Sequence, residues 1–165
     1  MNHVKCGFLW TIEEIKDGVL LSTEQVHNLV PVEGLNYILN AALKNGTPFP
    51  SFYVGLYEGA YTPTPGDEMA TFPTAATELT AYAETTRRLL TLGAVSAGAV
   101  DNSASRAEFT GNVNGKLAQG GFISSAPTKG AATGVLVSAV RFPSPRPLDA
   151  GTVLRVTAAF NIVSL

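Results

Sequence analysis

Residues 152–163 of this 165-residue chain read TVLRVTAAFNIV, and apolar residues alternate there with polar or small ones. A period of two predicts a β-strand with one buried face. The inward set is predicted to be Leu154, Val156, Ala158, Phe160 and Ile162, opposite Arg155, Thr157 and Asn161. This stretch is the clearest strand in the sequence, and it indicates a β protein.

The same alternation at the other end of the chain predicts a β-hairpin over residues 1–30. Asp17-Gly18 is a strong signal for a tight turn, because both turn positions need a positive φ. The expected inward residues of the first strand are Cys6, Phe8, Trp10 and Ile12, and Val19, Leu21 and Thr23 continue the return strand toward Val26. We expect this hairpin to be an N-terminal extension of a domain formed by residues 31–165.

One amphipathic helix is predicted over residues 31–44. Pro31 suits a first helical turn, Glu33 favours the positive end of the helix dipole, and Gly46 follows the predicted end. The apolar positions at helical spacing are Val32, Leu35, Ile38, Leu39, Ala42 and Leu43. We expect this apolar face to pack against a sheet, with a neighbouring subunit as the alternative.

The remaining sequence predicts short strands separated by glycine and proline. We expect a strand at Thr85–Leu92, a long loop at Gly59–Pro73, and a hairpin turn at Asn114-Gly115 leading into Lys116–Ile123. Val135–Phe142 is apolar on both faces, which favours a central strand that stops at Pro143. Seven or eight such strands predict a mainly β fold, an antiparallel β-sandwich or jelly roll with one helix.

The composition narrows the possible partners. The net charge is -2 and no basic run is longer than Arg87-Arg88, so a nucleic-acid partner is not expected. No apolar run is long enough for a membrane span, and the N-terminus does not resemble a signal peptide. Charged residues make up 15% of the chain, against about 25% in ordinary soluble domains. Such a surface fits either a plain globular domain or one that is largely covered in an assembly.

Residues able to carry catalysis or bind a metal are few. The two histidines and single cysteine form no metal-ligand motif, and Asp67-Glu68 lacks the ligand ladder of a calcium loop, so no metal, cofactor or catalytic site is expected. Cys6 with His27 is conceivable as a nucleophile–base pair, but an inward cysteine is usually a core residue. Tyr53, Tyr57 and Tyr61 near Glu58 could stack on a sugar. We favour an interface for these tyrosines.

Several short segments, taken in order, resemble a family of small structural proteins of tailed bacteriophages. They cover most of residues 26–160, and each is weak when taken alone. The segments are VHNLV (26–30), EGLN (33–36), FYVGLY (52–57), YTP (61–63), ELTAY (78–82), ETTR (84–87), VDNSA (100–104), TKG (128–130) and the final strand (153–159).

The resemblance implies a virion component, with head decoration (cement) as the first choice. Such a protein is made in the host cytoplasm, binds the major capsid protein and copies of itself as a dimer or trimer, and has no catalytic residues. A tail, adaptor or fibre-associated protein and a glycan-binding module are the alternatives. The candidate contacts with the lattice or with other subunits are Phe8, Trp10, Ile12, Val19, Leu21, Tyr53, Tyr57, Tyr61 and Phe72.

Overall fold

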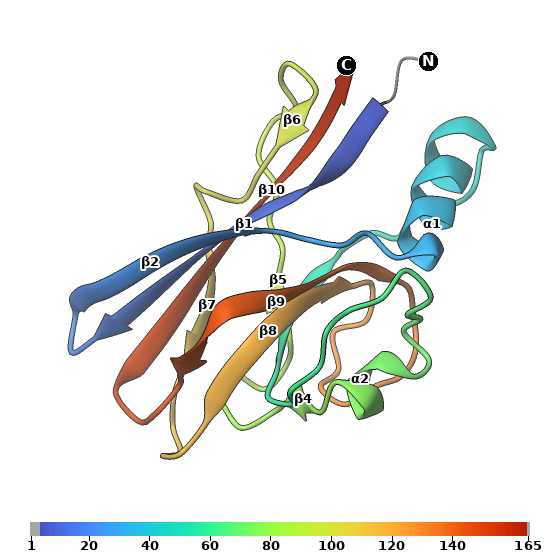
Figure 1. Ribbon diagram of the computed structural model, residues 1–165. Helices are drawn as coiled ribbons and strands as arrows, with labels where there is room; N and C mark the ends of the chain where they lie inside the picture. The colour runs from blue at the N-terminus through green and yellow to red at the C-terminus, as the bar shows by residue number, and fades with distance from the viewer. Residues whose placement is uncertain (1–3, 165) are drawn as a thin grey trace.

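A computed structural model describes residues 4–164 of the chain, and Figure 1 shows two antiparallel sheets packed into a sandwich. The first sheet has the order β2-β1-β10-β6, and β7 also pairs with β10. The second has the order β4-β3-β8-β9, and β5 also pairs with β3. The strands are β1 (Val4–Lys16), β2 (Val19–His27), β3 (Tyr53–Tyr57), β4 (Glu78–Leu79), β5 (Arg88–Leu89), β6 (Ala99–Val100), β7 (Ala107–Thr110), β8 (Leu117–Ser124), β9 (Leu136–Pro147) and β10 (Thr152–Ser164), and the helices are α1 (Val32–Leu43) and α2 (Phe72–Ala75).

The expected mainly β sandwich with one long helix is confirmed. Strand β10 lies in the middle of the first sheet, and Leu154, Val156 and Ala158 are fully buried as the alternation predicts. Phe160 is only partly buried and Ile162 is exposed. The ends of β1 and β10 rise together at the top of Figure 1, so the last inward positions of β10 lie beyond the densest part of the core. Among the described residues, neither helix is long and apolar enough to cross a membrane.

The N-terminal hairpin forms with the predicted turn. Asp17 and Gly18 have φ values of 50° and 78°, and they join β1 to β2. However, β1 pairs with β10 from Val4 to Lys16, so it is an inner strand of the sandwich. A boundary near residue 30 therefore does not separate an extension from the sandwich. Residues 1–3 of the expected hairpin lie outside the described residues.

Cys6 departs from the expected inward face. Phe8, Trp10 and Ile12 are buried, but Cys6 is exposed. It lies near the start of β1, where the strand extends past the buried part of the first sheet. The alternation correctly assigns the face of the strand, but it cannot show where the opposing sheet ends.

Helix α1 begins and ends one residue inside the predicted range, but its apolar face is mostly not packed. Gly34 is its one buried residue among those described, and a Cβ there would lie 2.7 Å from the carbonyl oxygen of Val137 in β9. Val32, Leu39 and Leu43 are all more than half exposed. The expectation that the helix lies along a sheet therefore holds at its N-terminal half only, where the missing side chain of Gly34 permits close approach.

Strand β9 differs from its prediction in both position and length. It pairs with β8 only, at the edge of the second sheet, and it continues through Pro143 to Pro147. An edge strand tolerates proline because one side of its backbone needs no ladder hydrogen bonds. Leu29 forms a bridge to Ala139, and α1 packs beside it. The first half of β9 is apolar on both faces because both faces are buried. Val137 and Val140 lie in the core between the sheets, and Leu136 and Ala139 lie in a second apolar cluster on the other face of the second sheet.

Two further expectations, a hairpin at Asn114-Gly115 and a strand at Thr85–Leu92, are not met by the fold. Gly115 has a φ of 78°, as a tight turn requires, but β7 and β8 on either side belong to different sheets. The Asn114-Gly115 turn thus connects the two layers and does not close a hairpin. The strand expected at Thr85–Leu92 is reduced to the two residues of β5, and the main-chain amide of Arg87 just before it donates to the Pro127 carbonyl oxygen of a loop.

The expected long loop at Gly59–Pro73 is packed tightly against the second sheet. Asp67 is buried, and it accepts hydrogen bonds from the Thr64 amide and from the hydroxyls of Thr64 and Tyr61. Met69 and Phe72 are buried in a second apolar cluster with Phe122. The loop is therefore ordered around Asp67, whose carboxylate accepts hydrogen bonds from donors in its own segment.

Candidate interaction surfaces

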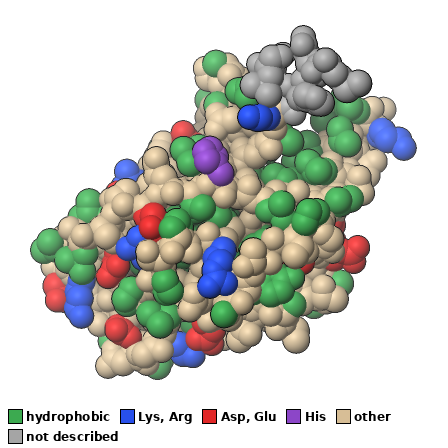
Figure 2. Space-filling view, in the orientation of Figure 1, with side chains coloured by type: hydrophobic (Ala, Val, Ile, Leu, Met, Phe, Trp, Pro, Cys, Tyr) green, Lys and Arg blue, Asp and Glu red, His purple; other side chains and the backbone are tan. Residues whose placement is uncertain are grey.

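The β1–β2 turn carries a group of exposed apolar side chains. Val19, Leu20 and Leu21 are 61%, 53% and 56% exposed, and we call these three residues the hairpin tip. The tip projects from the sandwich at the lower left of Figure 1, and apolar side chains gather at the corresponding end of the space-filling view in Figure 2. Three consecutive apolar residues so far from the core contribute little to folding, which makes them candidates for binding.

The hairpin that bears the tip is held by contacts with β9 of the second sheet. Arg146 of β9 donates hydrogen bonds to Ser22 (2.7 Å) and Glu24 (2.6 Å), and it lies 3.6 Å from the Glu14 carboxylate. Trp10 is fully buried and its indole nitrogen donates to the Ser138 hydroxyl. The hairpin is therefore joined to the second sheet by apolar packing and by a cluster of charges, and this presents the tip in a fixed direction.

A second apolar area lies at the opposite end of the sandwich. A cleft of about 110 Å³ opens there, and its walls include Ile38 of α1, Val100 of β6 and Phe160 of β10. Exposed apolar side chains lie on the same elements and the adjoining loops: Leu39, Leu43, Phe49, Leu92, Val95, Ile162 and Val163. Sequence reasoning assigned the helical members of this set to the core, because amphipathic spacing alone cannot show whether a neighbouring layer reaches the end of a helix.

The three tyrosines do not form an exposed sugar-stacking patch. Tyr57 is fully buried, and its hydroxyl donates to the carbonyl oxygens of Val140 (3.0 Å) and Tyr61 (3.2 Å). Burial raises the pKa of the Tyr57 hydroxyl, and the hydrogen bond to Asp67 raises the pKa of Tyr61. Tyr53 and Tyr61 are partly buried. Glu58, the carboxylate nearest them in sequence, forms an ion pair with Lys116.

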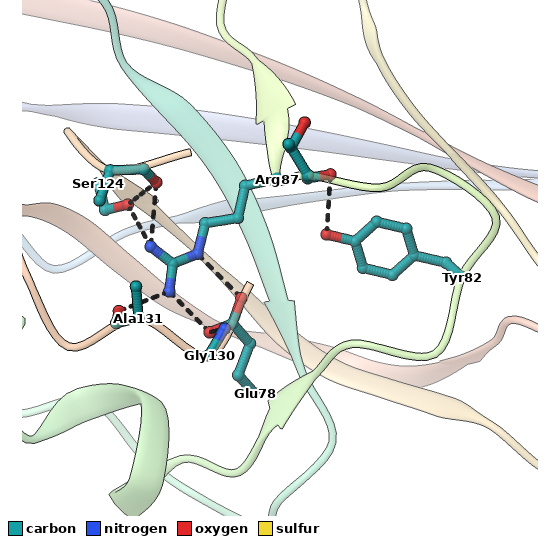
Figure 3. Close-up of polar contacts among 8 residues, drawn as sticks. Glu78, Tyr82, Arg87, Ser124, Gly130 and Ala131 are labelled. Carbon is teal, nitrogen blue, oxygen red and sulfur yellow. Dashed lines mark hydrogen bonds and ion pairs between the residues drawn. The ribbon is translucent and has the colours of Figure 1, made fainter. Parts of the chain in front are cut away.

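The largest polar feature of the interior is an ion pair that sequence reasoning missed. Arg87 and Glu78 have side chains that are 0% and 2% exposed, and the guanidinium donates to both carboxylate oxygens at 2.9 and 2.7 Å (Figure 3). Arg87 also donates to the Ser124 hydroxyl and to the carbonyl oxygens of Ala126 and Ala131. All the guanidinium nitrogens therefore have hydrogen-bond partners within the chain. The role of this group is structural, because it connects separate loops to one another.

Neighbouring residues add further hydrogen bonds around this ion pair. The Gly130 amide donates to Glu78, and the Tyr82 hydroxyl donates to the Thr86 carbonyl oxygen. Lys129 donates to the carbonyl oxygens of Thr80 and Tyr82, with its ammonium 3.5 Å from the centre of the Tyr82 ring. Burial lowers the pKa of the Lys129 ammonium and raises the pKa of the Tyr82 hydroxyl. In the sequence, the only signal for this cluster is an arginine nine residues after a glutamate, which fits no regular spacing.

The structure divides the nine predicted contact residues into two groups. Val19 and Leu21 are exposed at the hairpin tip, and Tyr53 and Tyr61 are partly exposed on the second sheet and its loop. The others contribute to the chain's own core, where they have little free surface for a partner: Phe8, Trp10, Ile12, Tyr57 and Phe72. Leu20, which the prediction omitted, is as exposed as its two neighbours.

The residues tested for catalysis are not brought together. Cys6 and His27 line one broad cleft beside the start of β1, but no hydrogen bond joins them. Among the described residues there is no group of three histidine, cysteine or acidic side chains that could hold a metal ion. Comparison with protein-family models, with curated proteins and with solved structures gave no match.

Proposed function

We propose that this chain is a head-decoration (cement) protein of a tailed bacteriophage that binds the outside of the assembled capsid lattice. Made in the host cytoplasm, it binds the major capsid protein on the virion surface and bridges neighbouring capsomers. The observation that carries the proposal is the hairpin tip, an exposed apolar group on a rigidly braced hairpin. The resemblance of residues 26–160 to phage structural proteins supports the virion context.

The mechanism is thermodynamic. A protein that binds the assembled lattice but not its separate parts stabilises the lattice by mass action. Each interface can be modest, because many equivalent copies act together and bridging contacts add through avidity. The sparse charge of the chain suits this role, since few ionic groups must lose their hydration when the surface is covered.

The copy number of the chain in purified virions tests this proposal. Quantitative mass spectrometry against the major capsid protein gives the ratio directly. Hundreds of copies per particle are expected for head decoration. Six, twelve or eighteen copies would assign the chain to a tail or adaptor and overturn the proposal, as would its absence from the particle.

A further inference from the structure

The outer edge of β2 is open. β1 is the only strand that pairs with β2, and within residues 4–164 no backbone hydrogen bond joins Val19–His27 to any other element. Proteins protect such edges with lysine, proline or an inward charge. The β2 sequence VLLSTEQVH has neither lysine nor proline, and its one acidic residue, Glu24, is paired with Arg146.

The backbone groups that face outward can be identified. The main-chain N–H of Asn28 donates to the Phe8 carbonyl oxygen of β1 at 3.1 Å, so it points toward β1. Successive residues of a strand direct their N–H and C=O groups to opposite sides, so Thr23, Gln25 and His27 direct theirs away from β1. These three residues are also exposed.

The regular part of the edge has two natural ends. Glu14 pairs with Ser22 and Ile15 with Leu20, so Leu21 is an extra, bulged residue. At the other end, Leu29 leaves the first sheet to form its bridge with Ala139 of β9. The free regular segment is therefore Ser22–Asn28, and its midpoint is Gln25.

From this geometry we propose that β2 pairs antiparallel with β2 of a second copy, about a two-fold axis at Gln25. The first sheets of the two copies then join into one continuous sheet. Residues that face each other would be Gln25 with Gln25, Glu24 with Val26, Thr23 with His27, and Ser22 with Asn28. No two like charges meet, and the ladder ends in both copies where the edge becomes irregular.

Other registers fit less well. An axis at Glu24 places two carboxylates opposite each other, which is destabilising. An axis at Thr23 requires the bulged Leu21 to pair with Gln25. The Gln25 register also leaves both hairpin tips free, at opposite ends of the paired edge. The inference is independent of the proposed cement function, because it concerns the isolated chain in solution.

Charge complementation tests the pairing. Gln25→Lys and Gln25→Glu each place like charges opposite each other at the axis, and each is expected to raise the dissociation constant of the dimer at least about tenfold. An equimolar mixture of the two variants should recover dimers, because a lysine then faces a glutamate. Sedimentation velocity at low ionic strength measures both effects.

Thr157→Lys is the matched control, since it adds the same charge to the inner strand β10 of the same sheet, away from the edge. It should leave the dimer intact, and thermal unfolding of each variant establishes that the fold is kept. A monomeric wild-type chain at its highest soluble concentration would overturn the proposal. Gln25 variants that dimerise like wild type would also overturn it. A chain that is monomeric alone, but whose Gln25 variants lose head binding, would assign the edge to a capsid-protein strand instead of a second copy.

Discussion

The loops of the second sheet and the hairpin of the first sheet are each held by an arginine, in different ways. In the loops of the second sheet, Arg87 is fully buried and all its nitrogens are paired. Beneath the hairpin of the first sheet, Arg146 stays slightly exposed and its Nε has no partner among the described residues. The first arrangement joins irregular loops to one another, and the second braces a regular hairpin whose apolar face is already packed. The loops around Arg87 therefore depend on one buried ion pair. The hairpin beside Arg146 is also held by apolar packing, and its tip is free to carry a binding surface.

The largest expected effect comes from breaking the buried pair. Arg87→Met leaves Glu78 as a buried charge without its partner, and we expect the free energy of unfolding to fall by about 3–5 kcal/mol. Denaturant unfolding monitored by tryptophan fluorescence measures the loss. Arg155→Met, which removes a half-exposed pair with Glu108, is the control and should cost about 0–1 kcal/mol. A loss of less than about 1 kcal/mol for Arg87→Met would mean that the loops do not depend on this pair.

Alkaline pH should act on the same half of the molecule. Burial raises the pKa of Tyr57 and Tyr82 above the ordinary value near 10, so both contribute stability that is present below pH 10 and is lost as the pH rises further. We expect the phenol groups of Tyr57 and Tyr82 to ionise only as the protein unfolds. Phenolate absorbance and circular dichroism, followed together, test this. Ionisation of every tyrosine before unfolding would contradict it.

Removal of the second arginine should have a smaller and more local effect. Arg146→Met leaves Glu14 and Glu24 partly exposed, so solvent replaces much of the lost interaction, and we expect a loss of about 1–2 kcal/mol. Amide hydrogen exchange should accelerate in β2 while β3 and β8 stay protected. Equal acceleration in both sheets would contradict this expectation, because it would show that the hairpin and the second sheet unfold as one unit.

Sequence reasoning recovers what is local and periodic. The hairpin turn at Asp17-Gly18, the helix at 32–43 and the buried face of β10 all follow from residue spacing. It fails where the answer depends on which elements become neighbours. The edge position of β9 and the crossing at Gly115 are set by sheet order, which no spacing encodes.

The candidate surface shows the same division. Alternation identifies Val19 and Leu21 as strand residues and also identifies Trp10 as one, but only the packing of the second sheet decides that Trp10 is buried and the tip is not. The Arg87–Glu78 pair is invisible for a related reason. The four residues that accept hydrogen bonds from the Arg87 guanidinium come from segments up to 44 residues away, brought together by the fold.

The tip itself is expected to matter least for folding and most for binding. Val19→Thr, Leu20→Ser and Leu21→Thr, made together, keep residues that tolerate a strand and should change the free energy of unfolding by about 0.5 kcal/mol or less. Deletion of the hairpin would not be a fair test, because β1 supplies Trp10 and pairs along its length with β10.

The most direct test is therefore the occupancy of this triple variant on heads that lack the protein, measured by gel beside wild type. Leu89→Thr with Val113→Thr, two exposed apolar residues outside both the hairpin and the second apolar area, is the matched control. We predict at least about a tenfold loss of binding for the tip variant and none for the control, since the tip loses the apolar area that a partner would cover. Wild-type occupancy by a folded tip variant would contradict the claim that the hairpin grips the lattice.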